Sequence, residues 1–165
     1  MELTPETVAR EAAWVHDRAD VVVPLVNDVR SDLGTAFDTA VDPIATQHFH
    51  QAIDSVFRDG DRAVNVAALV AILRDLDVEA DYPGFVVDEL LARELAAMIA
   101  GQQPLRLLAE ATFHYADIHH HGQSKDEPAG LDDLDAALAA GVQTRLPGWE
   151  WRESESPFSV DPHRS

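Results

Sequence analysis

The side chains best suited to chemistry are histidines and carboxylates that recur between residues 105 and 121. An α-helix turns by about 100° per residue, so a helix over this segment places Glu110, His114, Asp117 and His121 in one stripe. Imidazoles and carboxylates three or four residues apart bind transition metals inside helical bundles. The same stripe also fits the solvent-facing side of an amphipathic helix, because the opposite side is largely apolar. That opposite side carries Leu105, Leu108, Ala109, Thr112 and Ala116.

Two further histidines fall beside apolar faces of predicted helices. His119 projects with Leu108 and Tyr115 rather than with the stripe, so we expect its side chain to be buried or half-buried. His48 borders the apolar face of an earlier helix, near Ile44. A histidine in such a position is either a hydrogen-bonded core residue or a metal ligand.

Glu94 is the most unusual carboxylate by position. Helical projection sets it among Val87, Leu90, Leu91 and Met98, which predicts that it is buried. A carboxylate removed from water must be paired, hydrogen-bonded or protonated. We therefore expect a buried salt bridge or hydrogen bond, or a metal ligand.

These residues together define one metal hypothesis. The candidate ligands of a transition metal are Glu94, Glu110, His114, Asp117, His119, His121 and His48. No other cofactor is predicted. A calcium loop beginning at Asp59 is excluded, because Ala63 and Val70 take positions that require oxygen ligands. The sequence also contains no phosphate-binding glycine loop, nucleophile elbow, dinucleotide motif or cysteine, so we expect a protein that is not an enzyme.

Helix signals follow one another along the chain and predict an all-α fold. Prolines at residues 5, 43 and 104 start apolar periodic segments, glycines at 101, 122 and 141 end them, and Pro24 divides or bends the first one. We expect a single-domain bundle of about six to seven helices over residues 1–141. Residues 63–76 are apolar nearly all round, which predicts the central helix of the bundle.

The last segment, residues 142–165, has no helical period and is predicted to be an irregular tail. It contains three large aromatic side chains, Trp149, Trp151 and Phe158. Such residues either fold back over the protein's own core or form the anchors of a protein interface.

Charge excludes more functions than it indicates. The sequence contains thirty acidic and twelve basic residues, which gives a net charge of -18. Binding to nucleic acid phosphates needs clustered cations, and an anionic membrane surface would repel the chain for the same reason. The remaining explanations are a basic protein partner or adaptation to high salt. The lack of a secretory signal and of a long apolar run predicts a cytoplasmic location.

Three functional hypotheses remain. The leading one is a non-enzymatic acidic interaction protein, acting as a homo-oligomer or as an accessory subunit. A helical-bundle metalloprotein with a histidine and carboxylate site is the second. The third is an antitoxin-like inhibitor that covers a basic partner with its negative surface.

Overall fold

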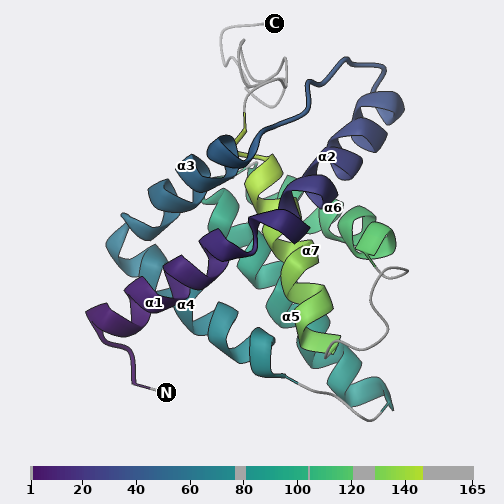
Figure 1. The fold of residues 1–165 in the computed structure, drawn as a ribbon. Coiled ribbons are helices and arrows are strands. Elements are labelled where there is room, and N and C mark those ends of the chain that lie inside the picture. Colours follow the sequence, from purple (N-terminus) through teal and green to yellow (C-terminus); the bar gives the residue numbers. More distant parts are fainter. Residues whose placement is uncertain (1, 77–80, 104, 121–128, 147–165) are drawn as a thin grey trace, which may run out of the picture.

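The computed structural model confirms the all-helical fold, with seven α-helices in the described part of the chain (Figure 1). The structure describes residues 2–76, 81–103, 105–120 and 129–146, with the backbone alone at 81–88, 120 and 129. The helices are α1 (Pro5–Asp17), α2 (Ala19–Ala36), α3 (Thr46–Phe57), α4 (Gly60–Asp75), α5 (Asp81–Ala100), α6 (Leu105–His120) and α7 (Ala129–Gln143).

The first two helices begin and end for local reasons. Thr4 caps α1, because its Oγ1 accepts a hydrogen bond from the Thr7 amide at 3.2 Å. The break between α1 and α2 lies at Arg18, where φ is -82° and ψ is 1°, and not at Pro24 as expected. Pro24 stands exposed inside α2, where a proline removes only one helical hydrogen bond.

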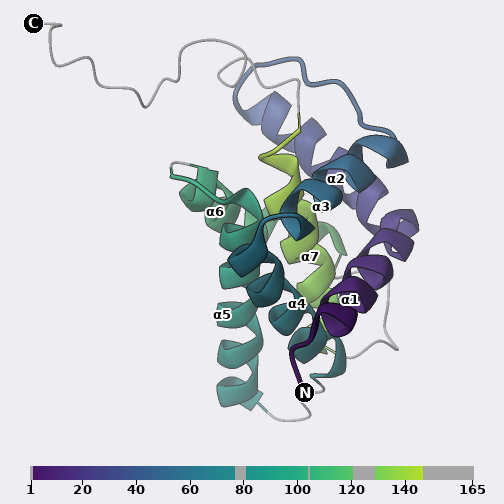
Figure 2. The same cartoon turned by 90° about the vertical axis from the view of Figure 1, so that its left-hand side faces the viewer.

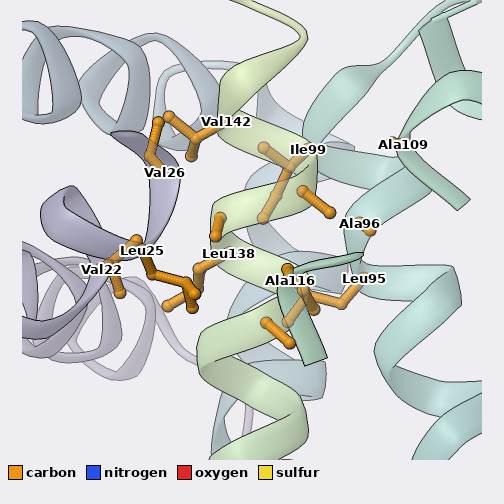
Figure 3. Close-up of a cluster of buried hydrophobic side chains, with 14 of the residues drawn as sticks. Val22, Leu25, Val26, Leu95, Ala96, Ile99, Ala109, Ala116, Leu138 and Val142 are labelled. Carbon is orange, nitrogen blue, oxygen red and sulfur yellow. The ribbon is translucent and has the colours of Figure 1, made fainter. Parts of the chain in front are cut away.

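Helix α7 is the most enclosed helix of the bundle. It packs against α2, α4, α5 and α6, and residues 133–144 are all buried. Figure 3 shows side chains of α2 on one side of α7 and side chains of α5 and α6 on the other. The helix over 63–76 was expected in this place. It corresponds to α4, which contributes to the core but leaves Val64 and Ile72 exposed.

Small residues let α7 occupy this position. A Cβ atom at Gly141 would lie only 2.8 Å from the Cβ of Ile99, and one at Gly130 only 2.3 Å from the carbonyl oxygen of Leu73. The backbones therefore approach closely at both ends of α7. Gly141 was expected to end a helix, but it lies inside α7 and serves this contact instead.

Helices α5 and α6 are antiparallel neighbours along one edge of the molecule (Figure 2). Gly101 ends α5 as expected, with a φ of +91° and its amide donating to the carbonyl of Ala97. The short connection brings the predicted stripe on α6 beside α5.

The boundary of the predicted tail falls inside the fold. Burial continues through Val142, Gln143, Thr144 and Leu146, since α7 runs two residues past Gly141. The aromatic residues Trp149, Trp151 and Phe158 lie outside the described residues.

Candidate functional site

The predicted metal ligands on α6 do not converge on one point, because they contact different neighbouring helices. His114 is 55% exposed and faces α5, where Arg93 Nη2 donates to its Nε2 at 2.6 Å. The same arginine donates to Glu89 at 2.7 Å. A guanidinium so close occupies the lone pair that a metal would need. The apolar side opposite the stripe is buried at Ala109, Thr112 and Ala116, as expected for an amphipathic helix.

His119 points away from this stripe toward α2. Its Nε2 is hydrogen-bonded to Asp32, and the side chain is half-buried, as predicted. Glu110 and Asp117 share the stripe of His114 on α6 and are partly exposed as whole residues. Oδ1 of Asp117 is nevertheless buried and has no hydrogen-bond partner within the described residues. His121 lies outside the described residues. Within the described residues, no three histidine or carboxylate side chains converge as metal ligands.

Glu94 is not buried, which corrects the prediction. Its side chain is 49% exposed and lies 3.4 Å from Arg106 Nη2 on α6. The buried face of α5 consists mainly of alanines instead, with Ala92, Ala96 and Ala97 buried beside Leu95 and Ile99. The helical projection predicted the wrong face of α5 as buried, because it gave weight to large apolar residues, whereas several of the positions that pack against other helices are alanines.

His48 has a local structural role. The amide of Ala45 donates to His48 Nδ1 at 3.0 Å, which satisfies a free donor at the start of α3. Because α3 packs mainly against α1, α2 and α4, His48 belongs to a different region from Glu94 and the α6 stripe.

A histidine pair that the sequence analysis missed joins α1 to α3. The rings of His16 and His50 stack with centroids 4.4 Å apart. Asp54 accepts from His16 Nε2 at 2.7 Å, and His50 Nε2 donates to the carbonyl of His16 at 3.1 Å. The only sequence signal was the spacing of His50 and Asp54, four residues apart on one helix.

Two buried ion pairs were also missed. Glu11 is 3% exposed and accepts from both terminal nitrogens of Arg74, at 2.5 and 3.1 Å. Asp135, fully buried on α7, accepts two hydrogen bonds from Arg18 at 2.9 and 2.7 Å. The Trp14 ring packs near both guanidinium groups. These contacts fasten α1 to α4 and α7.

The outer face of α6 is apolar and has no neighbour in the described structure. We define the α6 outer face by Leu107, Ala111, Tyr115 and Ile118, which recur at helical spacing. Leu107 is 62% exposed, Tyr115 43% and Ile118 74%. Scattered exposed apolar residues are ordinary, whereas several on one helix face mark an interaction surface.

None of the helices in the described residues is long and apolar enough to cross a membrane. Comparison with curated proteins and with solved structures finds no match. Residues 1–162 match the family model described as Domain of unknown function (DUF7984). The chain therefore belongs to the DUF7984 family.

Proposed function

We propose that this protein is a non-enzymatic helical interaction protein that self-associates through the α6 outer face. The observation that carries the proposal is the exposure of three large apolar side chains, Leu107, Tyr115 and Ile118, on one side of one helix. Burying such a side chain stabilises a complex by roughly 1.5–3 kcal/mol. The proposal keeps the cytoplasmic location expected from the sequence.

Charges beside the α6 outer face favour a second copy of the chain as the partner. Arg106, Glu110, His114 and Asp117 line its α5 side in that order. When two such helices pack antiparallel about a two-fold axis, the α5 sides of both copies meet. Arg106, which lies 3.4 Å from Glu94 of its own copy, then faces Asp117 of the other copy. Glu110 faces His114, which is hydrogen-bonded to Arg93 of its own copy. Each pairing occurs twice, so the flank is complementary to itself.

The small size of the face predicts a weak complex. The stripe from Leu107 to Ile118 spans about 16 Å of helix at 1.5 Å per residue. A standard interface buries about 800 Å² on each partner, which is more than one short helix face supplies. We therefore expect a dimer with a Kd in roughly the micromolar range.

Sedimentation of the full-length chain over a wide concentration range tests the proposal. We expect a concentration-dependent dimer whose Kd rises about tenfold or more in the Ile118→Ser variant. In a two-fold dimer the substitution occurs in both copies, so it removes two buried side chains. The matched control is Ile72→Ser, since Ile72 is 47% exposed on α4, away from α6. A monomer at every concentration contradicts the proposal, as does equal behaviour of the two variants.

A charge reversal tests the predicted antiparallel arrangement. Arg106→Glu places a carboxylate opposite Asp117 of the second copy, so we expect further weakening of the dimer. Because the change also breaks the pair with Glu94, thermal unfolding must show that the variant remains folded. Arg10→Glu makes the same change of charge at an exposed site on α1 and controls for overall repulsion. Equal effects of the two reversals would contradict this arrangement.

Salt dependence separates self-association from binding to a basic protein. Two copies of a chain with a net charge of -18 repel each other, so added salt strengthens their association. Binding to a basic partner weakens with salt instead. A dimer lost at high salt would therefore argue for charge-driven contacts rather than the apolar α6 outer face.

A further inference from the structure

A pocket of about 290 Å³ lies between α3 and the C-terminal end of α7 (Figure 1). Leu146, the last of the described residues, is part of its lining. We propose that this pocket receives the indole ring of Trp149 from the same chain. The pocket is also lined by His48, Gln51, Ala52, Ser55 and Arg145. None of these residues belongs to the α6 outer face, so the inference is independent of the proposed function.

The residues that follow Leu146 favour a return of the chain toward the pocket. The sequence Leu146-Pro147-Gly148-Trp149 has proline and glycine at the two central positions of a type II β-turn. Proline fixes its own φ at about -65°, and glycine adopts the positive φ that the third position of this turn requires. A β-turn holds its first and fourth Cα atoms less than about 7 Å apart. The sequence therefore predicts that Trp149 lies beside Leu146, at the edge of the pocket.

The size of the pocket suits one aromatic side chain. A closed cavity of about 150 Å³ holds a benzene molecule, whereas pockets for drug-sized ligands begin at about 300 Å³. A pocket of about 290 Å³ has room for an indole, which is larger than benzene. It lies just below the range that larger ligands need.

The lining offers contacts to both the face and the edge of an indole. Arg145 Nη1 donates to the carbonyl of Ile99 at 3.1 Å, and Nη2 donates to Ser55 Oγ at 2.8 Å. The N–H groups of a guanidinium lie in its own plane, so an aromatic ring can stack on the face of this group while the N–H groups are engaged. Gln51 on α3 carries an amide oxygen that can accept a hydrogen bond from the indole N–H.

Attachment to the same chain favours Trp149 over a separate ligand. Two residues separate it from Leu146, so its ring is held near the pocket at an effective concentration in roughly the millimolar range. Trp151 has the same side chain but lies beyond the predicted turn. It is therefore the natural comparison within the same segment.

Nuclear magnetic resonance of the full-length chain tests the proposal. The ring current of an indole shifts the signals of nearby nuclei, so the backbone amides of Gln51, Ala52 and Ser55 report on an occupied pocket. We expect Trp149→Ala to shift these three signals and Trp151→Ala, the matched control, to leave them in place. In the unsubstituted chain the indole N–H of Trp149 should exchange with solvent about tenfold or more slowly than that of Trp151.

Gly148→Val tests the turn while both tryptophans remain. Valine disfavours a positive φ, so we expect the same shifts of the α3 signals as with Trp149→Ala. Unchanged α3 signals in the Trp149→Ala variant would overturn the proposal, and so would equal shifts with Trp149→Ala and Trp151→Ala. Shifts that depend on protein concentration would place the ring in the pocket of a second copy, which contradicts the assignment to the same chain.

Discussion

Glu11 and Asp135 show how single carboxylates are tolerated inside this protein. Each is buried and accepts two hydrogen bonds from one arginine, so its charge is matched where water is excluded. The hydrogen bonds with Glu11 raise the pKa of Arg74 above its ordinary value. The associated stability is present below that ordinary pKa and is lost only as pH rises past the raised one. The Arg74 cation is therefore constant across neutral and mildly alkaline pH.

Replacing one member of the buried pair tests this account. Glu11→Gln should lower the free energy of unfolding by roughly 3 kcal/mol, because it leaves the Arg74 guanidinium without its counterion. Asp75→Asn is the control, since Asp75 lies 3.8 Å from the same arginine but is 79% exposed. Urea unfolding of both variants provides the measurement. A similar small loss for each would mean that the buried pair contributes little.

Glu11 also shows what the sequence could not reveal about single residues. Helical projection predicted that Glu94 is buried, but its side chain is half exposed. It gave no sign that Glu11 is buried. A carboxylate is buried when an arginine from another helix reaches it, and Arg74 lies 63 residues away along the chain. For the same reason His114, His119 and His48 were expected in one site, but each meets a different neighbour.

Among the elements, α7 owes its central position to small side chains. Alanines at 136, 137, 139 and 140 are fully buried, and Gly141 lies against Ala96 and Ile99 of α5. Small residues allow several helices to approach one axis closely. Larger apolar residues keep neighbours at a greater distance, and some of them, such as Ile72 and Ile118, remain outside.

A pair of glycine substitutions tests the close approach. Gly141→Ala adds a Cβ that would lie 2.9 Å from the carbonyl oxygen of Ala96. We expect a net loss of roughly 1–2 kcal/mol, because overpacking exceeds the gain in helix propensity. Gly60→Ala meets nothing within 4 Å at the start of α4, so it should leave stability unchanged or slightly higher. Thermal unfolding of both variants measures the difference, and equal effects would argue against tight packing at Gly141.

The helices themselves were predictable because their signals are local. Thr4 caps α1, Gly101 ends α5, and apolar periodicity marked most of the segments between. Which helix occupies the centre was not predictable from hydrophobicity, which favoured residues 63–76. Centrality depends on how closely backbones approach, so it is a property of side-chain volume across several helices. The stop expected at Gly141 failed for this reason, since that glycine serves packing and not helix termination.

For the whole molecule, the net charge of -18 predicts a strong dependence of stability on salt. Self-repulsion opposes the compact state, and salt screens it over a Debye length of about 10 Å at 0.1 M and 3 Å at 1 M. Tm should therefore rise between these salt concentrations. A further rise above about 1 M would indicate adaptation to high salt, because simple screening is nearly complete there.

Asp28→Asn provides the internal control for this experiment. Asp28 is exposed in the middle of α2, so removing its charge should raise Tm at low salt and have no effect at high salt. Calorimetry in potassium chloride measures both proteins. A Tm that does not change with salt would show that the acidic surface is spaced widely enough to avoid repulsion.

The central position of α7 has a consequence for how the protein is made. All the other helices of the described residues leave the ribosome before α7 does, yet α2, α4, α5 and α6 pack against it. During synthesis the apolar faces of these helices cannot be fully buried until residues 129–146 have been made. Nascent chains that stop before α7 would lack the centre of the bundle, so the apolar faces of the other helices would remain exposed. In a circular permutant that begins with α7, this central helix would be synthesised first. The other helices could then pack against it as each one is made.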